Sequence, residues 1–214
     1  NSHEQILESF GRGDADILIG TQMIVKGHDF SRVTLVGVLL ADLTLFSGDY
    51  RAGERTFDLL TQAAGRAGRG DVPGKVVIQT YKPDNYAITA AASQDYRAFY
   101  DIEVAYRSLM RYPPEWNMMV IMGTGMDEEQ LANIMDRMYS LIRGKYINAG
   151  HLSVIGPSEP AISKIKDVYR RVLYIKHRDY RMLVDVKDYV EKWLKENGEN
   201  DVSVFFDLNP VNMY

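Results

Sequence analysis

The sequence predicts an α/β domain built on a parallel sheet, followed by a smaller α+β domain. Apolar runs at 16–20 and 33–40 are rich in β-branched residues and lack polar alternation. Such runs are typical of strands that are buried on both faces of a parallel sheet. The segment Tyr112-Pro113-Pro114 ends a long helical run, because proline disfavours helical conformation in the residue before it. It separates the two domains.

Helices and strands alternate in the first domain, for which we predict residues 1–86. A short helix at about 4–10 precedes the two apolar runs, and an amphipathic helix is expected at 54–64. A third strand follows at 75–81. This order of elements is typical of an α/β layer fold.

A helical connector is predicted over residues 87–112. Its apolar side chains recur at about the helical spacing and predict one buried face, made of Ile88, Ala91, Ala92, Phe99, Ile102, Ala105, Tyr106 and Leu109.

The second domain, residues 113–214, has the predicted order βαββαβ. The strands are expected at 118–123, 152–155, 169–176 and 202–207, and the helices at 127–143 and 180–196. Asp127 is the candidate N-cap of the first of these helices, which begins with acidic residues. The order is that of the ferredoxin-like split motif. Because that fold carries many unrelated functions, the order alone predicts no activity.

Residues 61–70, TQAAGRAGRG, place Arg66 and Arg69 three positions apart among small residues, directly after the predicted helix at 54–64. The guanidinium group offers a rigid fork of donors that matches phosphate oxygens, and glycine lets the backbone approach a ligand closely. The combination suits stabilisation of charge on a transferred phosphoryl group. The alternative is an ordinary helix C-terminus with solvated charges.

A second motif lies at 20–30, GTQMIVKGHDF, where a polar connection leaves the carboxyl end of the first predicted strand. Open α/β sheets bind their ligands at such ends. This run resembles motif V of superfamily-two helicases, and QAAGRAGR at 62–69 resembles motif VI. Together with DYRAGERTFDLL at 49–60, they resemble the primosomal replication-restart helicases, the PriA family. The similarity continues through Ile78-Gln79-Thr80 and Tyr112-Pro113-Pro114 and covers nearly the whole chain.

The resemblance implies a RecA-like second helicase lobe and a small terminal domain that helps to bind DNA. The intact protein is then expected to be an ATP-dependent DNA helicase that binds forked DNA and restarts stalled replication through primosome assembly. The resemblance also implies roles for six residues: catalytic for Arg66, Arg69 and Gln62, nucleotide-binding for Gly27 and Asp29, and contact with a phosphate of single-stranded DNA for Thr21.

Several parts of such a helicase are absent from the sequence. The chain has no GxxxxGK[ST] phosphate loop, no acidic box that could hold Mg²⁺, and no cysteine. We therefore expect a carboxyl-terminal fragment that does not hydrolyse ATP alone. ATP and Mg²⁺ would be held in the intact protein mainly by the missing lobe, zinc by a cysteine-rich region upstream, and no cofactor or metal by this chain.

Composition limits the remaining possibilities. The net charge is −4 over 214 residues, so nucleic-acid contacts must come from local patches. The lack of cysteine excludes a disulfide framework and fits a cytoplasmic protein. No apolar run approaches the ~20 residues of a membrane span, so no membrane partner is expected. By resemblance, the partners are single-stranded and forked DNA, single-strand DNA-binding protein and primosome loading proteins.

One local basic patch lies at 163–178, where six basic residues occur with one acidic residue. If 168–176 is a strand, its period of two places Arg170, Val172, Tyr174 and Lys176 on one face. Basic groups with an interleaved tyrosine suit contact with a single-stranded backbone and base stacking. The alternative is a solvated sheet face beside acidic helices. The candidate DNA-binding residues are Lys164, Arg170, Arg171, Tyr174 and Lys176.

Two further classes of function stay open from the sequence. The chain could be a DNA-binding or protein-docking module without an ATPase context, or part of another superfamily-two repair translocase that shares motif VI. Trp116, beside the double proline, either packs in the core or offers a stacking platform for a base.

Overall fold

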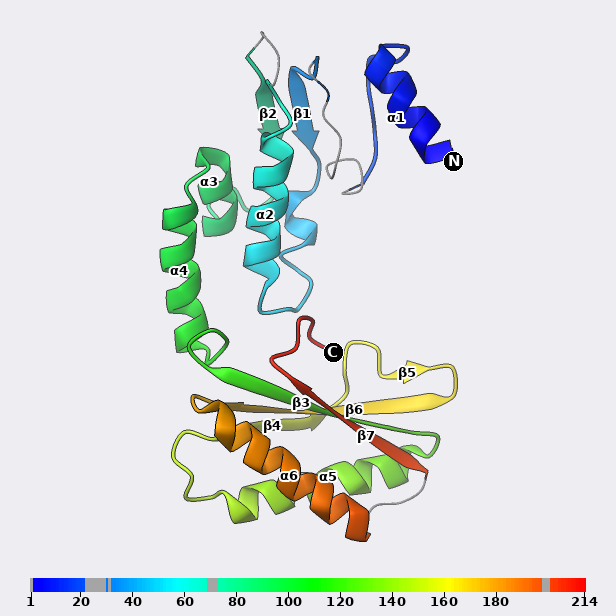
Figure 1. Cartoon of the computed structure of the whole chain (residues 1–214), viewed down its shortest axis with the longest axis vertical. Helices are drawn as coiled ribbons and strands as arrows, with labels where there is room; N and C mark the ends of the chain where they lie inside the picture. Colours follow the sequence, from blue (N-terminus) through cyan, green and yellow to red (C-terminus); the bar gives the residue numbers. More distant parts are fainter. Residues whose placement is uncertain (1, 22–29, 31, 69–72, 198–200) are drawn as a thin grey trace. The chain divides into compact units, whose positions relative to one another are not determined.

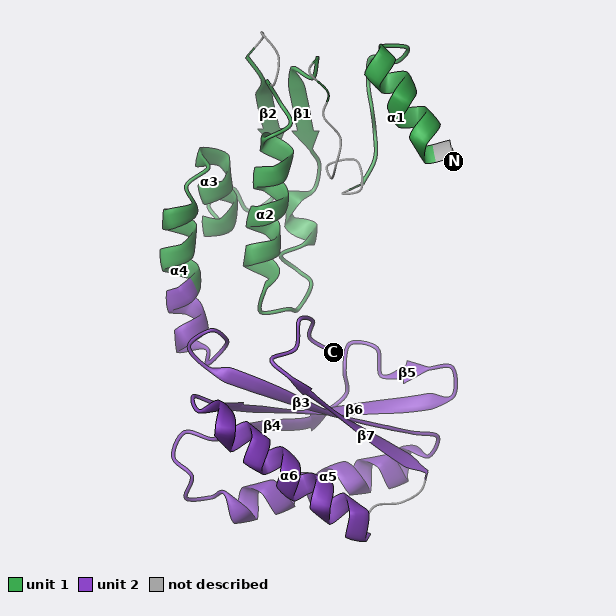
Figure 2. Ribbon diagram, in the orientation of Figure 1, with its two compact units in different colours: residues 1–103 green, residues 104–214 purple. Residues whose placement is uncertain are grey.

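The computed structural model describes residues 2–21, 30, 32–68, 73–197 and 201–214 (Figure 1). The chain divides into two compact units, Asn1–Glu103 and Val104–Tyr214, which Figure 2 colours separately. Each unit has its own hydrophobic core and its own sheet, parallel in the first and antiparallel in the second.

The first unit combines helices with a two-stranded parallel sheet. Strands β1 (Leu35–Val38) and β2 (Lys75–Ile78) pair in parallel, with Leu35 opposite Lys75 and Val38 opposite Ile78. The prediction of an α/β unit with a parallel sheet is confirmed at this level. The other elements are α1 (Ser2–Arg12), the 3-10 helix η2 (Ala41–Leu43), α2 (Ala52–Ala64), α3 (Tyr86–Ser93) and the first part of α4 (Tyr96–Leu109).

The strand predicted at 16–20 does not form. Ile17 and Ile19 are 77% and 88% exposed, and residues 17–20 have no regular secondary structure. A β-branched run favours extended backbone, but a strand also needs a neighbouring strand that satisfies its peptide groups. Within the part of the chain that the structure describes, no strand pairs with this run.

The core of the first unit gathers small and aromatic side chains where α2 meets α3 and α4. Phe57 of α2 stacks on Phe99 of α4, with 4.3 Å between the ring centroids. Ala87, Ala90 and Ala91 of α3 are buried beside them and allow its backbone to approach α2 closely. Stacked aromatic pairs contribute beyond the area that they bury, so this pair fixes α2 against α4.

The predicted helical connector consists of two helices, and its predicted buried face is only partly correct. Ile88, Ala91 and Phe99 are buried, as predicted. Gln94 adopts a left-handed conformation with φ 55° and ends α3, so α4 starts with a new helical phase. The buried residues of α4 are therefore four positions apart, at Phe99, Glu103 and Arg107. The side chains of Ala92, Ile102, Ala105, Tyr106 and Leu109 are exposed instead.

The second unit is a helix-covered antiparallel sheet with the strand order β4-β6-β3-β7. Its elements follow the predicted order, with one additional two-residue strand, β5, that pairs with β6. They are β3 (Asn117–Gly125), α5 (Glu128–Lys145), β4 (Ser153–Ser158), β5 (Lys164–Ile165), β6 (Val168–His177), α6 (Tyr180–Asn197) and β7 (Val202–Leu208).

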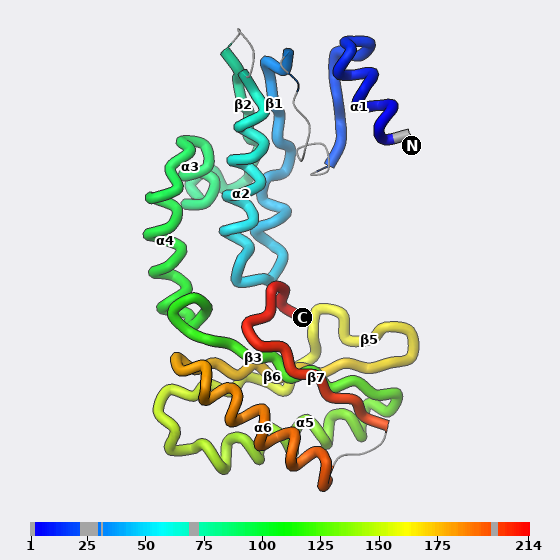
Figure 3. Tube along the Cα trace, in the orientation of Figure 1, coloured from blue at the N-terminus to red at the C-terminus, as the bar shows by residue number. Residues whose placement is uncertain are grey.

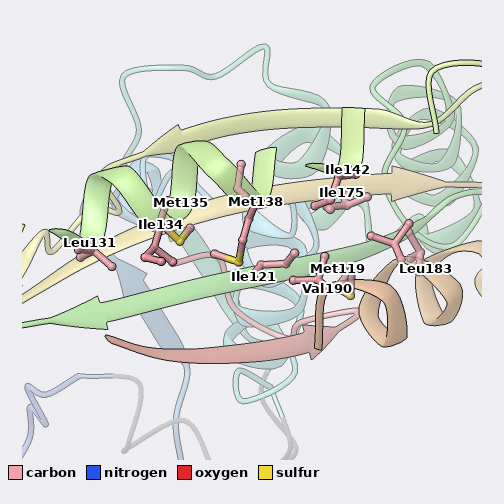
Figure 4. Close-up of a cluster of buried hydrophobic side chains, with 12 residues drawn as sticks. Met119, Ile121, Leu131, Ile134, Met135, Met138, Ile142, Ile175, Leu183 and Val190 are labelled. Atoms are coloured by element: carbon pink, nitrogen blue, oxygen red, sulfur yellow. The ribbon is translucent and has the colours of Figure 1, made fainter. Parts of the chain in front are cut away.

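Helices α5 and α6 lie on the same face of this sheet (Figure 1). Figure 4 shows Met119, Ile121 and Ile175 of the sheet facing apolar side chains of both helices. Helix α5 begins where predicted, because the Asp127 side chain accepts a hydrogen bond from the Gln130 N–H at 2.9 Å. Within the described residues, no helix has both the length and the apolar composition of a membrane span.

The opposite, helix-free face of the sheet has a small cluster of its own, formed by Val120, Met122 and Val172 with Tyr174 packed against it. Figure 3 traces the chain to its last residues, which follow β7. The end of this segment reaches the helix-free face, because the Tyr174 hydroxyl donates to the Tyr214 carbonyl at 3.0 Å. The predicted alternation of β6 is therefore confirmed: Leu173 faces the helices, whereas Val172 and Tyr174 face away from them.

Candidate functional site

The segment after α2 returns directly to the start of β1. Helix α2 ends in tight turns, in which the Arg66 N–H donates to Ala63 at 3.1 Å. Two residues later, the Gly68 N–H donates to the Val33 carbonyl, also at 3.1 Å. The segment that carries Arg66 thus contacts the chain shortly after Phe30, the last residue of the second motif. The structure therefore joins the Arg66 segment to the chain three residues after the end of the second motif.

Glycine is required where this segment closes on the chain before β2. Gly68 has φ +72°, and a Cβ atom there would lie 2.5 Å from the backbone nitrogen of Gly74. A Cβ atom on Gly74 would likewise collide with the nitrogen of Gly68. Residues with side chains rarely adopt such a φ and cannot accept such contacts. The sequence pattern of glycines around Arg66 therefore has a structural cause at Gly68.

Helix α1 packs against the second motif from another side. The Phe10 and Phe30 rings meet edge to face, with 5.0 Å between their centroids. Next to them, the Arg32 guanidinium donates to the Gly11 carbonyl at 3.2 Å. The end of the motif is thus fixed between the C-terminal turn of α1 and the start of β1.

The structure places the six residues of these motifs as follows. Gln62 is exposed on α2, Arg66 is half-buried just after it, and Thr21 is exposed at the end of the extended segment that follows α1. Gly27, Asp29 and Arg69 lie outside the described residues. Among the described residues, no group of three His, Cys, Asp or Glu side chains could hold a metal ion.

A buried carboxylate at the other end of the sheet is not evident from the sequence. Asp42 of η2 is 3% exposed and accepts hydrogen bonds from the Thr80 hydroxyl at 2.7 Å and the Tyr81 N–H at 2.9 Å. The Thr80 bond, followed by the Tyr81 bond, lowers the pKa of Asp42. These bonds join the chain after β1 to the chain after β2. The residue has a structural role at the carboxyl ends of the two strands.

A second buried polar contact fixes the helix that precedes Arg66. The Tyr86 hydroxyl donates to the Glu103 carboxylate, and Glu103 is only 6% exposed. Gly53 of α2 lies against this pair, because a Cβ atom there would be 2.6 Å from the hydroxyl oxygen and 2.7 Å from the carboxylate. Helix α2 is therefore positioned by Gly53 and by Phe57, one turn farther along. A sequence pattern of apolar spacing cannot reveal such a polar contact.

The candidate DNA-binding residues of the second unit separate into three groups. Arg170 and Tyr174 are half-buried on the helix-free face. The Arg170 guanidinium donates to the Ile162 carbonyl at 3.1 Å and contacts the Met122 sulfur at 3.4 Å. It thus lies along the sheet surface with its position fixed by neighbours. Phe205 of β7 lies opposite Met122 of β3 and is 59% exposed, so it belongs to the same face.

Two other basic side chains are paired with carboxylates. Lys164 lies 3.8 Å from Asp167 and packs over the Tyr169 ring at 4.3 Å. Arg171 lies on the side of the sheet that the helices cover, 3.8 Å from Glu128 of α5. Exposed pairs of this kind weaken the local positive charge but contribute little stability. The positive charge counted along the sequence is therefore distributed over both faces and partly neutralised.

Lys176 is buried rather than available at the surface. Its side chain is 5% exposed, and its Nζ atom lies 3.4 Å from the centroid of the Tyr112 ring and 3.3 Å from the Met110 carbonyl oxygen. Burial, and next the positive charge of Arg111, lower the pKa of Lys176 to about 8. The simple prediction of Lys176 as a surface contact for a DNA strand is therefore not supported by its position. Trp116 is also buried, at 5% exposure, so it packs and offers no open face to a base.

Comparison with known proteins finds one family model that matches within each unit. Residues 1–71 match the family model described as the helicase conserved C-terminal domain. Residues 108–211 match the model described as the primosomal protein N C-terminal domain. The two models thus cover most of the chain, in the order expected from the two motifs and the double proline.

Similar curated proteins share one description. The replication restart protein PriA of Bacillus subtilis (strain 168) is 41% identical over 214 residues, which are 99% of this chain and 26% of the relative. The protein of the same name from Synechocystis sp. is 37% identical over 99% of this chain and 25% of the relative. The replication restart protein PriA of Haemophilus influenzae is 34% identical over 98% of this chain and 28% of the relative. The chain spans about a quarter of the length of these relatives, and it belongs to the PriA family of replication restart proteins.

Proposed function

We propose that this chain forms the second motor lobe and the terminal domain of an ATP-dependent DNA helicase that restarts stalled replication. The observation that carries the proposal is the hydrogen bond from the Gly68 N–H, in the Arg66 motif, to the carbonyl of Val33, three residues after the end of the second motif, at 3.1 Å. It supports a common edge for both motifs, as a site for one nucleotide requires. Membership of the PriA family supports the biological process.

In this proposal, Arg66 and Arg69 approach the γ-phosphate of ATP, and Gln62 lies beside them. Bound ATP with Mg²⁺ would supply the phosphoryl group whose transfer drives movement along DNA. The first unit fits the part of a site that provides cations: Arg66 follows a helix whose position is fixed by Gly53 and Phe57. It has no GxxxxGK[ST] loop to hold the phosphates, so another lobe must provide most of the nucleotide contacts.

The remaining motif residues would connect the nucleotide to DNA. Gly27 and Asp29 would lie near the nucleotide, and Thr21 would hold a phosphate of the single strand. Closure of two lobes on ATP and their opening after hydrolysis would shift the grip along the strand. The RecA-like identity of the first unit is part of this proposal.

The second unit is proposed as a ferredoxin-like domain that binds single-stranded or forked DNA on its helix-free face. Arg170 supplies a cation whose position is fixed, while Tyr174 and Phe205 supply aromatic surface on the same face. Single-strand binding sites combine these two features, a basic track and stacking platforms. Single-strand DNA-binding protein and primosome loading proteins are proposed as partners of the intact protein.

The proposal separates ATP turnover from DNA binding. The isolated 214-residue chain should bind a single-stranded oligonucleotide but should hydrolyse no ATP above background, with or without DNA. A full-length protein that carries it should hydrolyse ATP when DNA is added. ATP turnover by the isolated chain that disappears in the Arg69→Ala variant would contradict the division of the site between two lobes.

A further inference from the structure

Three cations gather around two aromatic rings at one end of the sheet of the second unit. The guanidinium carbons of Arg111 and Arg178 lie 5.1 Å and 5.4 Å from the Trp116 ring. The Lys176 Nζ atom lies 3.4 Å from the Tyr112 ring. We name these five residues the Trp116 cluster.

The cluster has an excess of positive charge. In the described part of the chain, neither Arg111, Lys176 nor Arg178 forms an ion pair with a carboxylate. Their charges interact directly, because the positive charge of Arg111 contributes to the lowered pKa of Lys176. Like charges in one place destabilise each other unless an anion joins them. The electrostatics of the cluster thus favour a bound anion.

The geometry of the cluster suits phosphate rather than a base. Trp116 is 5% exposed and packs against both guanidinium groups, so its ring is not open to stacking. The two arginine side chains themselves are exposed. A guanidinium packed on a ring keeps its N–H edge free, in an orientation fixed before a ligand binds. Such edges match the oxygens of a phosphate group.

The cluster also lies at the end of the face to which DNA binding was assigned. Lys176 follows Arg170 and Tyr174 with the period of two along β6, so all three belong to the helix-free side of the strand. Lys176 lies six positions after Arg170 along the strand, about 20 Å at 3.3 Å per residue. A single strand that runs along β6 would thus meet a cation near each end and aromatic surface between them.

We propose that Arg111 and Arg178, supported by Lys176, form a phosphate-binding site for the backbone of single-stranded DNA. The site deepens the proposed function of the second unit and rests on it. The continuity with Arg170 and the aromatic Tyr174 favours a nucleic-acid backbone over an acidic peptide. The exposed arginines bind the phosphate, whereas buried Lys176 contributes its charge from behind.

The test measures binding of a single-stranded oligonucleotide to the 214-residue chain over a range of salt concentrations. In the double variant Arg111→Ala/Arg178→Ala, two phosphate contacts are lost. The slope of log K against log salt should therefore become less steep by about 1.4, since each contact on a single strand contributes about 0.7. If the two proteins bind equally at 1 M salt, this difference in slope gives a loss of affinity of roughly 25-fold at 0.1 M salt.

The matched control removes two positive charges and two cation–π contacts from α5, away from the Trp116 cluster. Arg137 lies 4.9 Å from the Trp193 ring and Arg143 lies 6.0 Å from the Tyr139 ring, both on α5. The variant Arg137→Ala/Arg143→Ala should keep the wild-type slope. Thermal unfolding of both double variants checks that they are folded. The variant Arg111→Lys/Arg178→Lys keeps the charges and serves as a second test: its salt slope should stay near that of the wild type.

The outcomes separate a failure of this phosphate site from a failure of DNA binding by the helix-free face. If Arg170→Ala/Tyr174→Ala weakens binding while the Arg111/Arg178 variant binds as the wild type does, the inference is overturned and DNA binding by the helix-free face survives. If neither variant changes the binding, both are wrong. If the Arg111/Arg178 variant loses binding of polyglutamate but not of the oligonucleotide, the cluster recognises acidic peptides and the inference is again overturned.

Discussion

Gly68 and Val33 are joined by a backbone hydrogen bond of 3.1 Å, although 35 positions of sequence separate them. The bond holds the segment that follows α2 against the chain that enters β1. Because Arg66 lies in that segment, the position of its guanidinium depends on this closure. The relationship explains why small residues surround the arginine: a larger residue at Gly68 would collide with Gly74.

Gly68→Ala should therefore destabilise the first unit. The positive φ and the contact of 2.5 Å with the Gly74 nitrogen both oppose a side chain, and strain of this kind costs about 1–3 kcal/mol. Gly48→Ala is the matched control, because Gly48 has φ +68° but nothing within 4 Å of the added Cβ. Denaturant unfolding should show a larger loss for Gly68→Ala than for Gly48→Ala. Equal losses would mean that only the backbone angle matters.

Lys176 should make the stability of the second unit depend on pH. Its pKa is about 8 in the folded chain and near its ordinary value of 10.5 when unfolded. Between these values the unfolded chain binds more protons, so stability rises with pH; below about pH 8 the full penalty of the buried charge applies. The difference in unfolding free energy between wild type and Lys176→Met should change by about 3 kcal/mol across this window.

The control for this measurement is Lys164→Met, since Lys164 is an exposed lysine of the same unit. It removes an ammonium group that is exposed and so measures the effect of losing a lysine without burial. A constant difference for Lys176→Met would show that the ammonium group is hydrated in the folded protein.

Arg170 and Arg171, which lie on opposite faces of the sheet, should respond differently to mutation. Arg170→Ala should weaken binding of a single-stranded oligonucleotide and reduce the salt slope by about 0.7, the value for one phosphate contact. Arg171→Ala should have a smaller effect, because Arg171 faces the helices and pairs with Glu128 at 3.8 Å. Fluorescence anisotropy titrations at several salt concentrations measure both. A larger effect of Arg171→Ala would place the DNA on the other side of the sheet.

Local patterns made much of the second unit predictable. The alternation of β6 and the N-cap at Asp127 depend on neighbouring residues, and both were predicted correctly. The burial of Lys176 was not predicted, because the group that covers it, Tyr112, is far away in sequence. A period of two assigns a side chain to a face but does not show what covers that face.

In the first unit, too, local sequence patterns do not show which distant residues an element meets. The run at 16–20 has the composition of a strand, yet pairing depends on a partner that local sequence does not specify. The left-handed turn at Gln94 resets the helical phase, so a single periodic pattern over 87–112 misplaces the buried face of α4. The two motifs were recognised from their residues, whereas the closure at Gly68 and the buried pair of Tyr86 and Glu103 required the structure.

ATP turnover by the full-length protein that carries Arg66→Ala tests whether this arginine stabilises the transferred phosphoryl group. An arginine that stabilises the transferred phosphoryl group is worth about 10³-fold or more in turnover, so DNA-stimulated hydrolysis should fall by that order. Arg66→Lys should restore little, because a point charge does not reproduce the planar fork. Arg97→Ala, which removes an exposed arginine from α4, is the control and should hydrolyse ATP normally.

Affinity for forked DNA is measured on the same preparations in the same buffer. We expect Arg66→Ala to lose turnover while it binds the fork within a few-fold of the wild type. Near-normal turnover in Arg66→Ala would show instead that the arginine is only part of a helix end.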